Sequence, residues 1–396
     1  MIRRLNLKKA NVARSNTIRD YNRQIVLNYI REEGPISRAD IARATALQRS
    51  TVSLIVDELS KHGLVQEVYG ESSGGRPPRL LSLKTAGAIA LGIDLGEKRI
   101  SIGACDLSGR VSDHEDFPTS KDHRKTLSRI IEVSRKYIDK HGGSIEGIGL
   151  SVPGLVESWD GGVIMIPHLD WKETDISRLL TEATGLPVRI ENDANAAAFA
   201  ELWLGRPEIS NVSHLVAFLI QEGIGTGIVF DGQIYRGKDG TAGEFGHMTI
   251  GSGAPSLCSA GDNSCWEAFA SETACRARYS NFSGSKSGNT SFAEIIDLAL
   301  DGDEKALKAL KDTAQYIGLG IANVVQGLSP ELSIVAGEIV RAWPLVGDEI
   351  VNAAESAVCQ DHPKVNVIPS TLGPRPTFKG ALSLVLADKF ASVSLS

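Results

Sequence analysis

Residues 90–103, ALGIDLGEKRISIG, have the pattern of a strand, a turn and a second strand, and Asp94-Leu95-Gly96 forms the turn. Turns of this outline bind phosphate when small residues let backbone N–H groups approach the anion. Glu97 and Lys98 stand at the next positions here. The sequence therefore combines the outline of a nucleotide site with side chains that crowd it.

Two other stretches carry polar groups suited to a ligand with several hydroxyls. Asn192 and Asp193 lie in ENDANAAAFAEL, at the expected start of a helix, and Glu244 and His247 lie in the glycine-flanked segment GTAGEFGHM. Carboxylates and amides satisfy hydroxyl groups that would be costly to bury unpaired. Taken alone, Asn192 and Asp193 are equally consistent with a simple helix cap.

The elements that would position these groups begin at about residue 87, where apolar strands alternate with helical segments such as 126–142 and 312–328. Residues 89–111 and 214–237 share a pattern of strand, glycine-containing turn and strand. This duplication predicts two similar lobes with a cleft between them, and each turn is expected to face the cleft.

The net charge of −6 is divided unevenly along the chain. Residues 1–84 contain 15 Lys and Arg against 8 Asp and Glu, whereas the remainder contains 27 against 40. This asymmetry predicts a basic module that binds a polyanion, attached to an acidic body that does not.

Three helices and a hairpin are expected in the basic segment: a helix over 20–32, a short helix capped by Ser37, and a third helix within 48–63. Residues 64–83 then have the pattern of two strands joined by a glycine-rich tip, which completes a winged helix-turn-helix. The expected DNA contacts are Gln48, Arg49, Ser50, Thr51 and Ser53 in the major groove, Arg76 in the minor groove and Arg79 on a phosphate. The alternative is a small helical domain for protein contacts.

Cysteine usage and hydropathy restrict the setting in which this chain works. The five cysteines form an odd, scattered set, which argues against a disulfide framework and for a reducing compartment. The basic start is followed by no apolar segment of signal length, and no run approaches the roughly 20 apolar residues of a membrane span. We expect a cytoplasmic protein with no membrane role.

Five motifs occur in a characteristic order: ALGIDLG, the Gly-x-Ser-x-Pro-Gly of GLSVPGLVE, ENDANAAAFAELW, GTAGEFGHM, and a cysteine-containing loop ending in CWE. Over about residues 87–390 they resemble the ROK family of repressors, open reading frames and sugar kinases. The resemblance implies a two-lobed, actin-like body of the hexokinase and ribonuclease H-like type. The predicted fold is α/β, with a winged helix-turn-helix at 1–86, a first lobe at 87–200 plus the C-terminal helix 378–396, and a second lobe at 201–377 with the sugar and metal loop and a dimer surface.

The resemblance also implies which residues contact a sugar in the cleft. They are Gly154, Asn192, Asp193, Glu244, His247 and Glu267. In the kinases of the family, the aspartate matching Asp193 takes the proton from the sugar hydroxyl. Asp193 would therefore be a base in an enzyme and a hydroxyl acceptor in a sensor.

A zinc site is the next feature that the resemblance raises. The family's metal loop runs Cys-x-Cys-Gly-x-x-Gly-Cys-x-Glu, with an upstream histidine as the fourth ligand. Here the loop reads CSAGDNSCWE, with Ala260 at the place of the middle cysteine. His247, Cys258 and Cys265 remain, so the loop is consistent either with a three-ligand zinc site or with two thiols that bind no metal.

The phosphate motifs depart from the kinase pattern more than the sugar motifs do. Glu97 and Lys98 alter the first turn, Gln221 and Glu222 replace Gly-Thr in the second, and Glu338 replaces a glycine near the adenosine motif. One like-charge contact at about 4 Å costs about 4 kcal/mol at a moderate effective dielectric. We therefore expect that the protein does not bind ATP and is not an enzyme, and that Asp193 is a vestigial catalytic base.

The sequence as a whole predicts a sugar-responsive transcription regulator. We expect a repressor of carbohydrate uptake or catabolism genes, with operator DNA and a sugar or sugar phosphate as partners. A homodimer or tetramer is expected, because one winged module reads too few base pairs. The alternatives are a ROK sugar kinase with an accessory DNA-binding domain and a repressor controlled by a partner protein.

Overall fold

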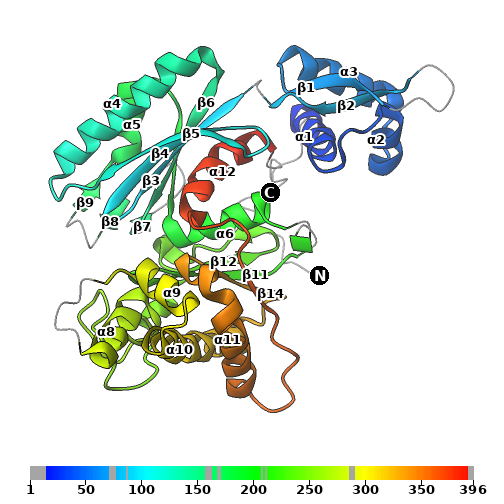
Figure 1. Ribbon diagram of the computed structural model, residues 1–396. Helices are drawn as coiled ribbons and strands as arrows, with labels where there is room; N and C mark the ends of the chain where they lie inside the picture. The colour runs from blue at the N-terminus through cyan, green and yellow to red at the C-terminus, as the bar shows by residue number, and fades with distance from the viewer. Residues whose placement is uncertain are drawn as a thin grey trace.

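The computed structural model describes residues 15–70, 77–85, 88–156, 163–166, 171–206, 208–209, 212–284 and 290–390. A small N-terminal domain lies against a body of two α/β lobes, each built on a five-stranded sheet (Figure 1). Helices α6 (Asp193–Leu204) and α12 (Pro376–Phe390) pack on each other in the middle of the body. Of the described helices, none combines the length and apolarity that a bilayer crossing requires.

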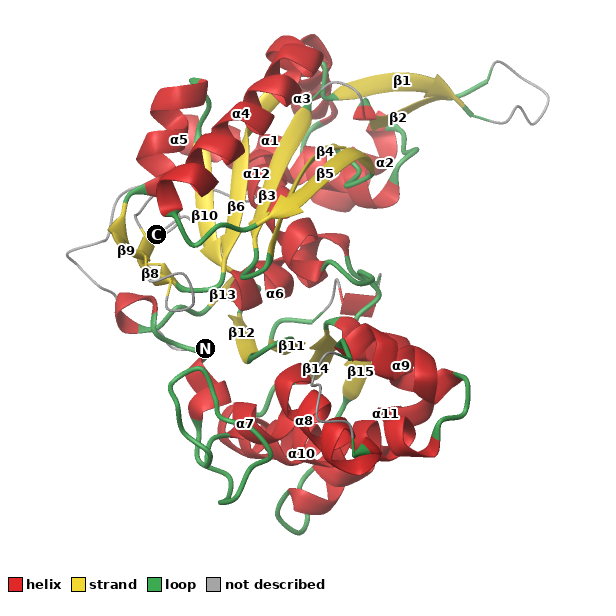
Figure 2. Ribbon diagram, turned by 60° about the vertical axis from the view of Figure 1, so that its left-hand side comes forward, coloured by secondary structure: helices red, strands yellow, loops and turns green. Residues whose placement is uncertain are grey.

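The N-terminal domain is a winged helix-turn-helix, as the sequence predicts. Its elements are α1 (Ser15–Glu33), α2 (Arg38–Thr45), α3 (Arg49–Lys61), β1 (Val65–Tyr69) and β2 (Arg79–Leu83). Ser37 caps α2 by accepting a hydrogen bond from the Asp40 amide at 3.1 Å, and Ala46 turns the chain toward α3 in the left-handed region. Strands β1 and β2 pair antiparallel and form the wing (Figure 2). Arg76, at the predicted wing tip, lies outside the described residues.

The first lobe is a sheet of order β10-β6-β3-β4-β5 with helices on both faces. Its strands and helices are β3 (Ile89–Leu95), β4 (Arg99–Asp106), β5 (Val111–Pro118), α4 (His123–His141), β6 (Ile145–Val152), α5 (Ile176–Thr184) and β10 (Val188–Asn192), beside a small sheet of β7 (Leu155–Val156), β8 (Val163–Ile166) and β9 (Trp171–Thr174). Helix α12 presses so closely on the sheet that a Cβ on Gly149 would lie 1.8 Å from the Ala381 carbonyl oxygen. A glycine is required there for the helix to reach the strands.

The second lobe is a sheet of order β13-β12-β11-β14-β15 beside a cluster of helices. Its elements are β11 (Leu215–Ile220), β12 (Ile224–Phe230), β13 (Gln233–Ile234), α7 (Trp266–Ala270), α8 (Glu272–Ser283), α9 (Phe292–Leu300), α10 (Glu304–Leu328), β14 (Leu332–Ala336), α11 (Trp343–Ala357) and β15 (Val367–Pro369), with short 3-10 turns η6 (Glu244–His247) and η7 (Glu338–Ala342). Trp266 is fully buried in its core and donates a hydrogen bond to the Tyr316 carbonyl oxygen at 2.7 Å.

The duplication predicted from the sequence is present, because β3-β4-β5 and β11-β12-β13 are both antiparallel three-stranded units. Two predicted boundaries differ from the structure. The lobe boundary at residue 200 falls inside α6, since the alanine-rich helix continues to Leu204 and ends at Gly205. The C-terminal helix begins at Pro376 rather than at 378, in keeping with the preference for proline in a first helical turn.

Candidate functional site

Asn192 begins helix α6 and joins it to the loop after β6. Its Oδ1 accepts hydrogen bonds from the amides of Ala194 and Asn195 at 3.0 and 3.1 Å, so the residue is a true N-cap. Its Nδ2 donates to the Gly154 carbonyl oxygen at 3.1 Å. The structure therefore brings Gly154 and Asn192 together, as the sequence predicts, and uses Asn192 as a cap at the same time.

Asp193 follows in the first turn of α6 and faces other carboxyl groups. Burial raises the pKa of Asp193 to about 7, opposed by its hydrogen bond from the Ala194 amide and reinforced by Asp94 and Glu244. Burial likewise raises the pKa of Asp94, at the end of β3, to about 6, although Thr377 of α12 donates a hydrogen bond to it at 2.7 Å. Three acidic groups from both lobes thus converge at the start of α6.

Glu244 and His247 supply the second-lobe side of this site from the turn η6. Their side chains are exposed, and the His247 Nε2 lies 4.0 Å from a Glu244 carboxylate oxygen. Although the Glu244 side chain reaches solvent, the protein around its carboxyl group removes part of the water and raises its pKa, while His247 opposes and Glu267 reinforces the shift. Side chains that are open to solvent and next to the acids of α6 are placed to meet a polar ligand.

Glu267 lies below the surface and is occupied by the protein itself. Its side chain is buried, and its two carboxylate oxygens accept hydrogen bonds from the backbone amides of Ile224 at 3.1 Å and Ser259 at 2.5 Å. It therefore ties the β11–β12 hairpin to the cysteine loop. The structure assigns it this supporting contact, and direct contact with a sugar stays a prediction.

Glu191 and Arg236 belong to the same site, although the sequence reasoning did not single them out. Glu191 is 1% exposed, and its carboxylate accepts hydrogen bonds from the Asn192 amide and the Asn195 side chain at 3.0 and 3.2 Å. Arg236, after β13 in the other lobe, donates to it from Nε at 2.9 Å. Burial raises the pKa of Glu191, and Arg236 opposes that shift. The sequence did contain one signal for this pair: Glu191 is a carboxylate in the buried part of a strand, directly before Asn192.

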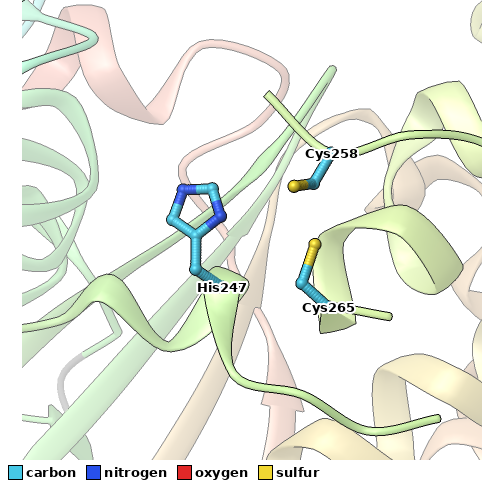
Figure 3. A group of neighbouring side chains, drawn as sticks. All are labelled: His247, Cys258 and Cys265. Carbon is cyan, nitrogen blue, oxygen red and sulfur yellow. The ribbon is translucent and has the colours of Figure 1, made fainter. Parts of the chain in front are cut away.

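The candidate metal ligands also come together (Figure 3). The ligand atoms of His247, Cys258 and Cys265 all lie within 4.8 Å of one another, and both thiols are buried. Burial, followed by the neighbouring Cys258, raises the pKa of Cys265 to about 12. Ala260 is exposed in the loop between the cysteines. Within the described residues this cluster offers three protein ligands, a donor set that suits zinc with an open fourth position.

The two turns that the sequence analysis compared with phosphate turns meet across the lobes. Lys98, between β3 and β4, forms an ion pair with Glu222, between β11 and β12, and Arg276 of α8 pairs with the other Glu222 oxygen. Although burial opposes it, the hydrogen bond from Lys98 and the charge of Arg276 lower the pKa of Glu222. Charges that appeared repulsive in the sequence are thus matched within the protein. Glu338 is likewise 3.4 Å from Arg341.

The predicted DNA-reading groups lie at the start of α3. Gln48, Arg49 and Ser50 are exposed, and Thr51 and Ser53 are half-buried. On the opposite face of the helix, Val52, Ile55, Val56 and Leu59 enter the core of the domain. At the wing, the Arg79 guanidinium pairs with Glu67 at 3.0 Å, so a phosphate contact by Arg79 would compete with that pair.

Comparison with known proteins places the chain in a family. The ROK family model matches residues 90–388. The chain belongs to the ROK family. A winged helix-turn-helix DNA-binding model matches residues 19–66 in addition, so this ROK member carries a DNA-binding domain.

The xylose repressor of Bacillus spizizenii is 33% identical over 384 residues, 95% of this chain and 97% of its own length. The crystal structure of a ROK family transcriptional regulator, described as a homologue of the E. coli MLC protein, has a TM-score of 0.79 at 27% identity, covering 94% of this chain and 98% of its own. A Streptomyces griseus ROK glucokinase in complex with glucose and AMPPNP has a TM-score of 0.68 at 25% identity, covering 75% of this chain and 99% of its own. The repressor-type relatives therefore span the whole chain, whereas the kinase matches the body.

Proposed function

We propose that this ROK protein is a transcriptional repressor whose winged domain binds an operator and whose body binds a sugar that changes operator affinity. Relatives that match nearly the whole chain support this, since they are a xylose repressor and a transcriptional regulator. The sugar site is assigned to Gly154, Asn192, Asp193, Glu244 and His247, supported by Glu267. A sugar alters DNA binding only if its affinity differs between the state of the protein that binds the operator and the state that does not.

One observation carries the proposal: helix α6 extends from the sugar site to the DNA-binding domain. Asn192 caps the helix, Asp193 is its first residue, and Trp203 lies in its last turn. At a rise of about 1.5 Å per residue, the two ends are about 15 Å apart. The Arg31 guanidinium, at the end of α1, lies 4.6 Å from the centre of a Trp203 ring. Helix α6 therefore contacts both the proposed sugar site and the DNA-binding domain.

The domain interface around this contact is apolar and continuous. Leu27 and Ile30 of α1 belong to one buried cluster with Leu382 and Leu386 of α12, and Trp203 packs at its edge. Helix α12 in turn holds Asp94 through Thr377. A shift of α6 or α12 caused by sugar would be transmitted to the DNA-binding domain by packing, because close-packed groups do not deform independently.

Trp203→Ala is expected to reduce the effect of sugar on operator affinity at least tenfold, while sugar affinity itself stays within about threefold, since the α6 N-terminus is unaltered. Anisotropy titrations of operator DNA with and without sugar measure both quantities. Trp203→Phe keeps an aromatic face for Arg31 and is the matched control, with most of the coupling retained. Unchanged coupling in the alanine variant would show that α6 does not transmit the signal.

Calorimetric titration of the full chain with a panel of pentoses, hexoses, amino sugars and their phosphates tests the sugar assignment. One member of the panel is expected to bind with micromolar to millimolar affinity. If the protein bound a specific operator but no member of the panel, a protein-controlled repressor would replace the present proposal.

The sugar-kinase alternative conflicts with the pairing of Glu222. The ion pairs with Lys98 and Arg276 occupy the turn at which a kinase would hold nucleotide phosphates, so we propose that ATP does not bind there. The double variant Glu97→Gly, Glu222→Gly is expected to bind magnesium-ATP at least tenfold more tightly than the wild type, measured with a fluorescent nucleotide. Sugar phosphorylation by the unmodified protein would establish the kinase instead.

For the cysteine loop, we propose at most a weak zinc site, because His247, Cys258 and Cys265 leave one coordination position without a protein ligand in the cluster. Zinc would there fix the loop that Glu267 supports. Ala260→Cys restores the missing thiolate and is expected to raise zinc affinity at least tenfold in competition with a chromogenic chelator. Ala260→Ser, which adds no thiolate, is the control, and equal affinity of the two variants would refute the assignment.

The remaining parts of the proposal follow from operator binding. A repressor works where the chromosome is, so we place the protein in the cytoplasm, on the nucleoid when bound to operator. A homodimer or tetramer would give two winged domains for two half-sites, and light scattering of the free protein measures this state.

A further inference from the structure

Leu54 is the exposed apolar residue on the reading face of α3. Its relative exposure is 72%, whereas Val52, Ile55 and Val56 beside it in sequence are buried in the domain core. Ser50 precedes it by four residues and Asp57 follows by three, so the three side chains share one face of the helix. Leu54 therefore lies in the middle of the surface that a major groove would cover.

Negative charge beside Leu54 is neutralised from within the domain. The Arg38 guanidinium pairs with Asp57 at 3.0 Å, and the Arg19 guanidinium pairs with Glu58 at 2.7 Å. The hydrogen bond from Arg19 lowers the pKa of Glu58. Helix α3 can therefore approach DNA without bringing uncompensated carboxylates toward the phosphates, and Leu54 can come within contact distance of the base edges.

We propose that Leu54 reads a thymine in each operator half-site through the thymine C5-methyl group. This rests on operator binding by the winged domain. The C5-methyl is the largest apolar group that base pairs present in the major groove; cytosine carries only a hydrogen at that position, and the neighbouring base-edge groups are hydrogen-bond donors and acceptors. Leucine has no polar group to offer them, so a different base at that position would leave a donor or acceptor facing hydrocarbon. Leu54 thus favours thymine by contact and disfavours other bases by desolvation.

The test removes the methyl group from the DNA and the leucine from the protein, separately and together. The operator is first obtained by selection from random DNA with the full-length protein. Each thymine is then replaced in turn by deoxyuridine, which differs by that one methyl. For the wild type, replacement at one position per half-site is expected to weaken binding about fourfold. For Leu54→Ala, the same replacement is expected to have no effect.

Two controls separate this result from a general loss of binding. Leu54 is so exposed that its replacement by alanine should leave the melting temperature unchanged, which scanning fluorimetry measures. Leu300→Ala removes a 49% exposed leucine in the second lobe and should keep the wild-type response to deoxyuridine. Full methyl sensitivity in Leu54→Ala, or none at any thymine in the wild type, would overturn the inference while operator binding stands. Failure to select any operator would instead overturn the proposed function with it.

Discussion

Replacing Asp193 by asparagine is expected to weaken sugar binding about 100-fold while the protein still folds and binds its operator. The substitution keeps the size of the side chain and leaves the Asn192 cap of α6 in place. It removes the carboxylate that would accept a sugar hydroxyl, and hydrogen bonds to charged groups contribute about 1.5–3 kcal/mol each. Calorimetry with the sugar that the wild type binds measures the loss.

Asp175→Asn is the matched control for this variant. Asp175 also lies at a helix N-terminus of the first lobe, where it accepts a hydrogen bond from the Arg178 amide at 2.9 Å, but it caps α5 instead of α6. Its replacement is expected to leave sugar affinity unchanged. If Asp193→Asn bound the sugar as tightly as the wild type, Asp193 would be only a structural part of the first turn of α6.

The second large effect is a loss of stability as the pH rises from about 4 to about 7. Burial raises the pKa of Asp193 to about 7 and that of Asp94 to about 6, from the ordinary aspartate pKa of 3.8. At a pH between 3.8 and these raised pKa values, Asp94 and Asp193 keep their protons in the folded protein but have lost them in the unfolded chain. Their contribution to stability is therefore complete below about pH 4 and is lost as the pH rises through about 7, at up to about 1.4 kcal/mol per pH unit for each group.

Comparison of the wild type with Asp193→Asn isolates this contribution from the rest of the protein. The wild-type melting temperature, followed by circular dichroism, is expected to fall several degrees more than that of the variant between pH 4 and pH 7. Asp94 and Asp193 repel each other when ionised, so they titrate as a pair and the transition is broad. Parallel curves for the two proteins would contradict the burial of Asp193.

Ionisation of Asp193 has an opposite consequence for the ligand. A carboxylate accepts a sugar hydroxyl better than a neutral carboxyl group does, so sugar affinity is expected to rise between pH 6 and pH 8 while stability falls. The two trends have the same cause. Measuring both on one preparation separates a titrating Asp193 from a general effect of pH on the fold.

Local features of this protein were predictable because short stretches of sequence determine them. The Ser37 cap, the helical period of α3 and the repeated β-hairpins were all predicted and are present. The two-lobed fold and the family followed from motifs that occur in the order typical of the family. The observed ends of α6 and α12 differ by a few residues from the predicted segment limits at 200 and 378, since helix ends depend on packing as well as on propensity.

Long-range pairings could not be derived from the sequence. Glu222 seemed to be a repulsive carboxylate, yet it is paired with Lys98, 124 residues away, and with Arg276. The pairing of Glu191 with Arg236 and the contact of Arg31 with Trp203 also join distant parts of the chain. Such pairs depend on how the lobes and the winged domain are placed, and nothing in a local pattern specifies that placement.

The central claim is that sugar and operator binding are coupled, and fluorescence anisotropy of the full-length protein on its operator, with and without saturating sugar, tests it most directly. The account predicts that one sugar changes the operator dissociation constant at least tenfold in the wild type and leaves that of Asp193→Asn unchanged at the same concentration. An operator dissociation constant that no bound sugar alters would contradict it.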